Sequence, residues 1–292
     1  MAKSALLKSS LAKKYWMALT GLFLCLFLAG HLAGNLQLIF SDAAHFNQYA
    51  LFMTSNPAVK ILSYLTYLSI LFHAVDGFLL TYQNVKARPI GYAKNNPSKN
   101  SSFSSRNMAV LGSLILVFIV VHMMNFWAVM HFDEKMPLFM QTVETNQGPS
   151  GEVYVGVIQG QYYAKDAVQI GEAEEPINPM APQQKQYVLK NRTEMYYYGT
   201  NVKAGDVYKD LHKITVAFFK DAKFGLIATI LYVLAMFVLA FHLLHGFQSA
   251  FQSLGLNNPK YTPAIKGFGA AFAILVPLLF ASIPVYIHFF LK

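Results

Sequence analysis

The chain has 292 residues, of which 55% are hydrophobic and only 13% are charged, and its mean hydropathy is +0.36. Because ordinary soluble domains carry about 25% charged residues, this composition argues against a soluble enzyme and favours a membrane protein. A single cysteine, Cys25, excludes an intrachain disulfide, a cysteine-ligated iron–sulfur cluster and covalent haem attachment through two cysteines. The net charge of +9 in such a chain indicates membrane topology rather than nucleic-acid binding.

Five apolar segments are long enough to cross a bilayer, which takes about 20 residues. The first follows four lysines, but it exceeds the apolar core of about 7–15 residues that is typical of a cleavable signal peptide, so we expect it to remain as a helix. The predicted fold is an all-α integral membrane protein with five transmembrane helices. The predicted spans cover residues 15–40, 59–82, 108–130, 224–251 and 267–290.

The distribution of charge predicts the orientation of these spans. Eleven of the 23 Lys and Arg residues fall on the side of the N-terminus, where there is no Asp or Glu. The other twelve are mixed with 13 of the 14 acidic residues, mostly in one long loop, where the positive-inside rule has little force. We therefore expect a cytoplasmic N-terminus and, since five spans are an odd number, an extracytoplasmic C-terminus.

A long polar segment separates the third span from the fourth. It divides the chain into residues 1–131 with spans 1 to 3, an extracytoplasmic insert over 132–222, and residues 223–292 with spans 4 and 5. The segment is too long for an ordinary connection. Its content of Tyr, Gly and Pro predicts a small, mostly irregular subdomain with a β-hairpin.

Four of the nine histidines lie well within four different spans, namely His31, His73, His122 and His242. An ionisable residue at membrane depth is costly and is functional by default. One such histidine could simply hydrogen-bond a neighbouring helix, but one in each of four helices makes that interpretation weak.

Depth divides these histidines into two pairs. At a rise of about 1.5 Å per residue, His31 and His122 lie about 12–14 Å below the outer ends of their spans, and His73 and His242 lie about 21–27 Å below theirs. In an up-and-down bundle of four helices the first and third are diagonal, as are the second and fourth. Each pair therefore bridges a diagonal and can supply both axial ligands of a haem iron, an arrangement typical of electron transfer.

Glycines accompany these histidines. Gly77 and Gly246 each follow a histidine by four residues, and Gly34 follows His31 by three. A missing side chain one turn away on the same face leaves room for a porphyrin, although such glycines also permit close helix packing. His245 lies three residues after His242 and near the same face, so spacing alone leaves either as the ligand.

These residues belong to longer motifs, and through them the chain resembles the di-haem cytochrome b membrane-anchor subunit of succinate dehydrogenase and fumarate reductase. The resemblance is greatest to the five-helix, single-chain form that works with menaquinone, and it covers about residues 10–127 and 205–290. Its motifs are GHL at 30–32, FHAVDG at 72–77, VHM at 121–123 and FHLLHGFQSAFQSLGLNNPKYTPAIK at 241–266.

The resemblance implies two b-type haems, with His31 and His122 as ligands of the outer iron and His73 and His242 as ligands of the inner iron. It selects His242 over His245. It also implies a bacterial cytoplasmic membrane, with an iron–sulfur subunit and an FAD-carrying flavoprotein subunit on the cytoplasmic side. Those subunits would hold the succinate site, and this chain would pass their electrons to menaquinone. The insert is longer than the usual loop of that family.

The quinone site is less well defined than the histidines. Asp42, His45 and Asn47, at the outer end between spans 1 and 2, are candidates for a proton-accepting group near the outer haem, and a solvated loop is the alternative. Asp76, three residues after His73, is a candidate for a hydrogen bond or a proton relay near the inner haem.

Three other functions compete with this one. A transporter or proton channel would use the intramembrane histidines and Asp76 as a relay and would be colourless. A cytochrome b of the bc type would place two histidines on each of two helices, whereas here four helices contribute one deep histidine each. Fumarate reductase is the alternative within the same family, since it differs in the direction of electron flow.

Overall fold

The computed structural model describes residues 9–90, 96–145, 148–171 and 185–292, and the chain divides into two compact units. The bundle unit consists of Met1–Phe40, Asn56–His122 and Phe218–Lys292, and the insert unit consists of Ser41–Ser55 and Met123–Ala217. The five predicted spans are confirmed as helices long and apolar enough to cross a membrane. They are Leu11–Phe40, Pro57–Lys86, Met108–Phe132, Gly225–Ser253 and Thr262–Phe289.

Local sequence signals set where these helices begin. Helix α2 starts after Ser9, whose hydroxyl accepts a hydrogen bond from the Ala12 N–H, and α5 starts after Asn56, whose side chain accepts from two backbone N–H groups. Proline occupies the first turn of α5 and of α12, where it breaks no helical hydrogen bond. The long helices are α2 (Ser10–Asn35), α5 (Pro57–Lys86), α8 (Met108–His122), α11 (Gly225–Ser253) and α12 (Thr262–Phe289).

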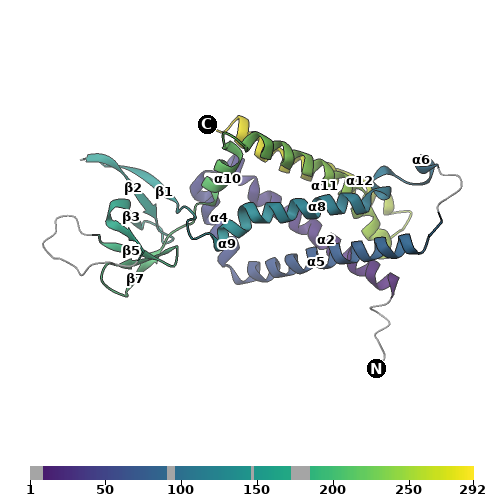
Figure 1. Cartoon of the computed structure of the whole chain (residues 1–292), viewed down its shortest axis with the longest axis horizontal. Helices are drawn as coiled ribbons and strands as arrows, with labels where there is room; N and C mark the ends of the chain where they lie inside the picture. The colour runs from purple at the N-terminus through teal and green to yellow at the C-terminus, as the bar shows by residue number, and fades with distance from the viewer. Residues whose placement is uncertain (1–8, 91–95, 146–147, 172–184) are drawn as a thin grey trace, which may run out of the picture. The chain divides into compact units, whose positions relative to one another are not determined.

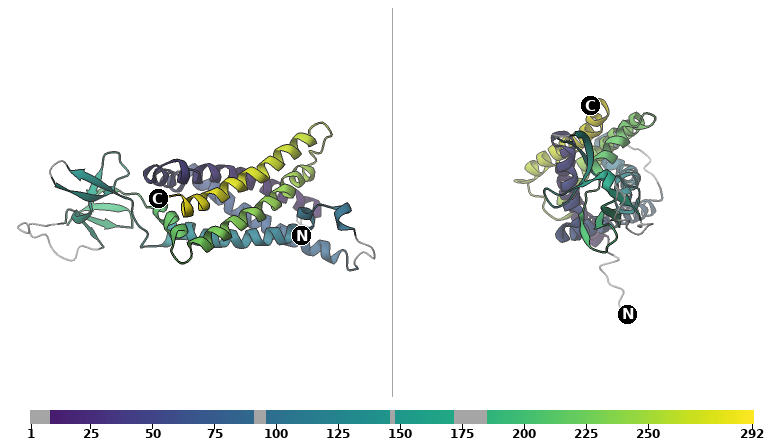
Figure 2. Two further views of the ribbon diagram at one scale, coloured as in Figure 1. Left: turned by 90° about the horizontal axis from the view of Figure 1, so that it is seen from above. Right: turned by 90° about the vertical axis from the view of Figure 1, so that its left-hand side faces the viewer.

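Four of these helices form a closed ring in the bundle unit. Helix α2 packs against α5 and α11, and α8 packs against the same two helices, so α2 lies diagonally opposite α8 and α5 opposite α11. Helix α12 lies outside this ring against α11 and α2. The long helices run beside one another in Figures 1 and 2. The diagonal arrangement is the one expected for an up-and-down bundle.

The contact between α11 and α12 depends on a small residue. A Cβ placed on Gly269 of α12 would lie 2.6 Å from Cδ1 of Phe247 on α11. Phe247 is itself buried, in a cluster with Cys25, Leu243 and Ala273. The absence of a side chain at Gly269 therefore lets the two helices approach closely.

The chain is mostly helical, with the five predicted helices, but the insert unit contains two β-sheets, so the prediction of an all-α fold holds only for the bundle unit. The core of the insert unit contains the buried tyrosines Tyr154 and Tyr163 as well as aliphatic residues. Because tyrosine has a hydroxyl group, the segment looks polar in sequence although it has a packed core. One antiparallel sheet has the order β1 (Met140–Thr145), β2 (Gly148–Val155) and β3 (Tyr162–Ala164). The other has the order β4 (Val168–Ile170), β5 (Tyr187–Lys190), β6 (Glu194–Tyr197) and β7 (Lys203–Asp206), with β4 parallel to β5 and the other pairs antiparallel. The insert includes the predicted β-hairpin, at β5 and β6, but it has more regular structure than we predicted.

Short helices complete both units. In the bundle unit they are α3 (Gln37–Phe40), α6 (Pro97–Asn100) and α7 (Phe103–Arg106). In the insert unit they are α4 (Ala43–Ser55), a π-helical segment (Met123–Ala128), α9 (Val129–Phe132) and a 3-10 turn (Lys165–Ala167). Helix α10 (Leu211–Lys220) begins in the insert unit. The insert unit thus includes Ser41–Ser55, which the sequence placed with spans 1 to 3.

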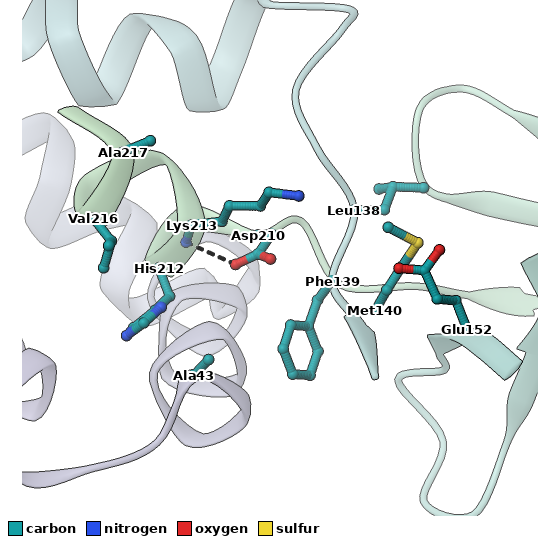
Figure 3. Close-up of a pocket in the computed structure, with 10 residues that line it drawn as sticks. All are labelled: Ala43, Leu138, Phe139, Met140, Glu152, Asp210, His212, Lys213, Val216 and Ala217. Atoms are coloured by element: carbon teal, nitrogen blue, oxygen red, sulfur yellow. Dashed lines mark hydrogen bonds between the residues drawn. The ribbon is translucent and has the colours of Figure 1, made fainter. Parts of the chain in front are cut away.

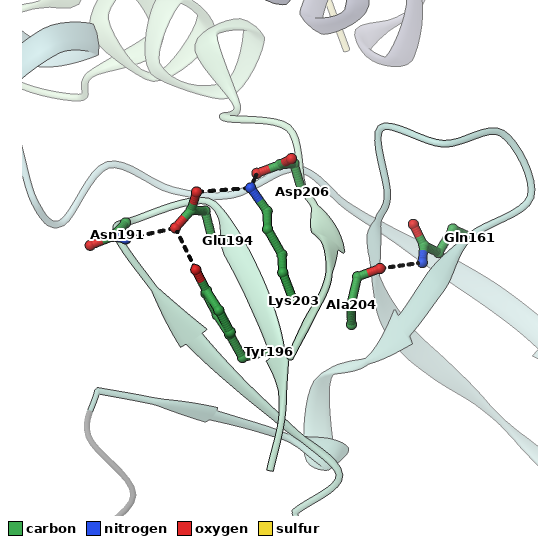
Figure 4. Close-up of polar contacts among 7 residues, drawn as sticks. All are labelled: Gln161, Asn191, Glu194, Tyr196, Lys203, Ala204 and Asp206. Carbon is green, nitrogen blue, oxygen red and sulfur yellow. Dashed lines mark hydrogen bonds and ion pairs between the residues drawn. The ribbon is translucent and has the colours of Figure 1, made fainter. Parts of the chain in front are cut away.

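A polar cluster fastens the hairpin of β6 and β7 (Figure 4). The Lys203 ammonium donates to the carboxylates of Glu194 and Asp206, both at 2.8 Å. Glu194 also accepts from the Asn191 amide at 2.6 Å and from the Tyr196 hydroxyl at 3.2 Å. These contacts raise the pKa of Lys203 and lower the pKa of Glu194. The cluster is a structural feature of an exposed sheet edge rather than a binding site.

The packing of α12 predicts different outcomes for two glycines in the same helix. Gly269→Ala should destabilise the bundle unit by about 1–3 kcal/mol, because the added methyl group overpacks against Phe247. Gly267→Ala is the matched control, since a Cβ there meets nothing within 4 Å, and it should be neutral or stabilising by up to about 1 kcal/mol. Thermal unfolding in detergent measures both, and equal unfolding temperatures would contradict the packing described here.

Candidate functional site

The four histidines that lie within the predicted spans form two pairs of neighbouring rings in the bundle unit. The rings of His31 on α2 and His122 on α8 have centroids 5.9 Å apart and planes at 87°. The rings of His73 on α5 and His242 on α11 have centroids 6.2 Å apart and planes at 66°. Each pair joins diagonal helices, and the partners are those that the depths indicated. On α11 it is His242, not His245, whose ring lies opposite His73.

Both ring separations suit a metal held between two imidazoles. A metal between two imidazoles makes two bonds of about 2.0–2.1 Å, one to each ring, and each bonded nitrogen lies about 1.1 Å from its ring centre. Together these distances place the two ring centres about 6 Å apart. Among the described residues no group of three or more His, Cys, Asp or Glu side chains could hold a metal ion. A haem iron, whose other ligands come from its macrocycle, would need one nitrogen from each of the two imidazoles.

Two glycines face the His73–His242 pair from the other two helices of the ring. A Cβ on Gly21 of α2 would lie 3.2 Å from Cε1 of His73, and one on Gly112 of α8 would lie 3.6 Å from Cε1 of His242. These contacts leave little room for a larger residue beside either imidazole. The structure thus identifies Gly21 and Gly112, which the sequence analysis missed.

A sequence signal for these glycines does exist. Gly21 precedes His31 by ten residues, and Gly112 precedes His122 by the same spacing. Ten residues of helix span about 15 Å, so each helix presents a histidine at one level and a glycine at the other. The repeated glycine-to-histidine spacing in two diagonal helices could have predicted both positions.

The glycines that the sequence analysis proposed have other neighbours. A Cβ on Gly77 would meet Cε of Met17 at 3.8 Å, and one on Gly246 would meet Cε of Met108 at 3.3 Å. Gly34 is buried near the end of α2. Contacts with flexible methionines fit close helix packing at Gly77 and Gly246, and their role beside a cofactor stays a prediction.

Aromatic rings line the His31–His122 pair. Phe27 stacks on His31 with centroids 5.2 Å apart, and Phe118 stacks on His122 at 5.6 Å. Tyr232 of α11 adds a further ring 6.0 Å from His122. Flat apolar side chains beside the imidazoles suit a large flat ligand, although such rings also pack well without one.

The polar neighbours of the imidazoles differ between the pairs. The Thr20 hydroxyl lies 3.3 Å from Nδ1 of His73. The Asn35 amide nitrogen lies 3.4 Å from both ring nitrogens of His31 and also donates to the His31 carbonyl oxygen at 2.8 Å. Asp76 is half-buried on α5, one turn from His73, and its proposed relay role stays a prediction.

The three quinone-site candidates lie in the insert unit. Asp42 is exposed, and its carboxylate accepts from the His45 N–H at 2.8 Å, so it caps the start of α4. The His45 side chain is exposed. Asn47 is only 1% exposed; its amide donates to the Asp210 carboxylate at 2.9 Å and accepts from the His212 N–H at 3.0 Å. Asn47 therefore has a structural contact that joins α4 to the start of α10.

The partners of Asn47 line an open cavity of about 440 Å³ within the insert unit (Figure 3). The Asp210 carboxylate accepts from the Lys213 N–H at 2.9 Å, the bond drawn there, and so caps α10. Burial lowers the pKa of His212, while Asp210 and Asp42 oppose that shift. His212 is therefore neutral at pH 7. The cavity mixes apolar and charged groups, of which the Asp210 carboxylate holds α10 and the Glu152 carboxylate pairs with Lys165.

Comparisons of the chain with models of protein families, with curated proteins and with solved structures gave no significant match. Neither a family nor an activity is therefore assigned by similarity. The function proposed below depends on the histidine pairs and on the motifs quoted above.

The contacts of Asn47 predict a structural role. Asn47→Ala should destabilise the insert unit by about 1–3 kcal/mol, because it removes a donor from the buried Asp210 carboxylate. His45→Ala on the same helix is the matched control and should stay within about 0.5 kcal/mol, because that side chain is exposed. Protease resistance of the insert measures both. An Asn47→Ala chain that keeps its resistance but reduces quinone slowly would instead support the predicted quinone role.

The lowered pKa of His212 predicts acid sensitivity. The unfolded chain binds the proton more readily than the folded one, so His212 should destabilise the insert unit progressively as the pH falls below the unfolded pKa of about 6.5. The loss should level off below the folded pKa. In His212→Gln, protease resistance of the insert should therefore fall less between pH 7.5 and pH 5 than in the wild type. Identical pH profiles would exclude His212 as a source of that sensitivity.

Proposed function

We propose that this chain is the cytochrome b membrane anchor of a succinate dehydrogenase, holding two b-type haems and passing electrons from an iron–sulfur subunit to menaquinone. The single observation that carries the proposal is the pairing of four intramembrane imidazoles at 5.9 and 6.2 Å. The motif resemblance through residues 241–266 supports the choice of family.

Each haem would be held by one histidine pair. His31 and His122 would bind one iron, and His73 and His242 would bind the other. Gly21 supports this assignment because the absence of its side chain lets one inner imidazole lie close to α2, as Gly112 lets the other lie close to α8. Phe27 and Phe118 would flank the first haem, while Gly34, Gly77 and Gly246 remain predicted positions beside the haems, with close helix packing as the alternative.

When bound, a haem with both axial positions filled by histidine supplies one-electron transfer and leaves no coordination site for oxygen. The protein contributes position and environment. Helices α2, α5, α8 and α11 hold two pairs at two depths in an apolar bundle, and they keep water and competing ligands from the imidazoles. The two levels are separated by about ten residues of helix, or about 15 Å, so together they would connect opposite faces of the membrane.

The orientation and the partners follow from charge and from the resemblance. The acid-free basic segments would face the cytoplasm of a bacterium and dock the iron–sulfur and flavoprotein subunits, which carry the iron–sulfur clusters, the FAD and the succinate site. Asp42 and His45 remain candidates for the menaquinone site, together with Asn47 if it has a role besides its contact with Asp210. The same arrangement would serve fumarate reduction with electrons flowing in the opposite direction.

Haem content tests this proposal. We expect the chain, purified in detergent with its bound subunits, to carry two b-type haems, at least one of which succinate reduces. The absorbance difference between reduced and oxidised samples, with a haem-to-protein ratio, measures this. A colourless chain would contradict the proposal and favour a proton channel that uses the histidines and Asp76.

Substitutions of the histidines test the ligand assignment. Each single substitution should remove one haem per chain or convert it to a five-coordinate, high-spin form, because one nitrogen ligand is lost. The four variants are His31→Leu, His73→Leu, His122→Leu and His242→Leu. His245→Leu is the matched control on α11 and should retain two low-spin haems. Loss of a haem in His245→Leu and its retention in His242→Leu would reverse the assignment on that helix.

A further inference from the structure

Thr20 of α2 is a buried hydroxyl beside an imidazole, with a relative exposure of 8%. Its oxygen lies 2.8 Å from the Trp16 carbonyl oxygen and 3.2 Å from that of Met17, and both of these can only accept. Either carbonyl oxygen can accept the single hydrogen of the hydroxyl, and the contact with Trp16 is the shortest of the three that Oγ1 of Thr20 makes. The hydroxyl oxygen keeps a lone pair, and Nδ1 of His73 lies 3.3 Å from it.

The direction of this hydrogen bond fixes the state of the ring. When the hydroxyl hydrogen is donated to the Trp16 carbonyl oxygen, the contact with His73 requires a proton on Nδ1, which His73 then donates to Thr20. The other ring nitrogen, Nε2, then has a free lone pair and is the one able to bind a metal. A hydrogen bond from the non-ligating nitrogen of a bound histidine also increases its basicity as a ligand.

The other imidazoles differ from His73 in this respect. Nδ1 of His242 is buried, and within the described part of the chain it has no hydrogen-bond partner. The polar neighbour of His31 is the amide nitrogen of Asn35, which is a donor rather than an acceptor. His73 thus has two acceptors within reach, the Thr20 hydroxyl and the Met17 backbone, whereas His242 has none in the described part of the chain.

We propose that Thr20 is a positioning residue that fixes the Nδ1-protonated tautomer of His73 and lowers the reduction potential of the haem bound there. Gly21 supports this role, because the absence of its side chain lets the His73 ring approach the helix on which Thr20 lies. The inference rests on the proposed function in one respect, since the reduction potential belongs to the haem. The tautomer of His73 is a property of the protein itself.

Redox titration of Thr20→Val and Thr20→Ser tests the proposal in the intact complex. Valine keeps the shape of threonine without its hydroxyl, so one of the two haems should shift about 3- to 10-fold towards the ferrous form, or about 30–60 mV at 59 mV per tenfold change. The Thr20→Ser variant should keep the wild-type potential. The ferrous-to-ferric ratio of the second haem should change by less than about twofold in either variant. Loss of one haem in Thr20→Val alone, with both retained in Thr20→Ser, would also support the role of the hydroxyl.

The control is Thr229→Val on α11. Thr229 is also buried, with a relative exposure of 2%, and donates to the Gly225 carbonyl oxygen at 2.9 Å, so this variant removes another helix-bound hydroxyl and should leave both potentials unchanged. Unchanged potentials in Thr20→Val, or the same shift in Thr20→Ser or Thr229→Val, would overturn the proposal.

A wild-type chain without haem would instead refute the proposed function. In that case the ¹⁵N chemical shifts of histidine in the labelled chain would still report the tautomer of His73. Proton occupancy on Nε2 of His73 in the wild type, or an unchanged tautomer in Thr20→Val, would then overturn the role of Thr20 independently.

Discussion

The bundle unit depends on the cost of burying an imidazole in a membrane. A polar ring at that depth needs a hydrogen bond or a metal, and four helices each carry such a ring. The structure brings these rings together as His31 with His122 and His73 with His242. Because each pair joins diagonal helices, all four helices of the ring must keep their order and rotation for either pair to form.

Two of these helices contribute a glycine beside one histidine pair and a histidine to the other pair. Helix α2 contributes Gly21 beside one pair and His31 to the other, and α8 does the same with Gly112 and His122. Small residues are therefore placed where a neighbouring helix contributes the imidazole. This alternation explains why a bundle of only four helices can hold two similar sites one above the other, and it leaves α12 free to cover α11 and α2 from outside.

Features that depend on neighbouring residues in the sequence could be predicted, whereas features that depend on contacts between distant segments could not. Hydropathy located the five spans, and the fixed rise of a helix was enough to pair His31 with His122. The role of Gly21 was missed because it requires knowing which face α2 turns towards α5. The contact of Asn47 with Asp210 was not predicted, because the two residues lie 163 positions apart in the sequence. The sequence predicted a β-hairpin in the insert but not two sheets, because the core of the insert contains buried tyrosines among few aliphatic residues.

The most direct test of the account is the low-temperature electron paramagnetic resonance spectrum of the oxidised, purified chain with its bound subunits. Iron held between two imidazoles is six-coordinate and low-spin, with no open position. If each histidine pair binds a haem, the spectrum should contain two distinct low-spin ferric haem signals in equal amounts and no high-spin signal. A single haem signal, a high-spin signal of comparable intensity or a spectrum without haem would contradict the assignment of two bis-histidine sites.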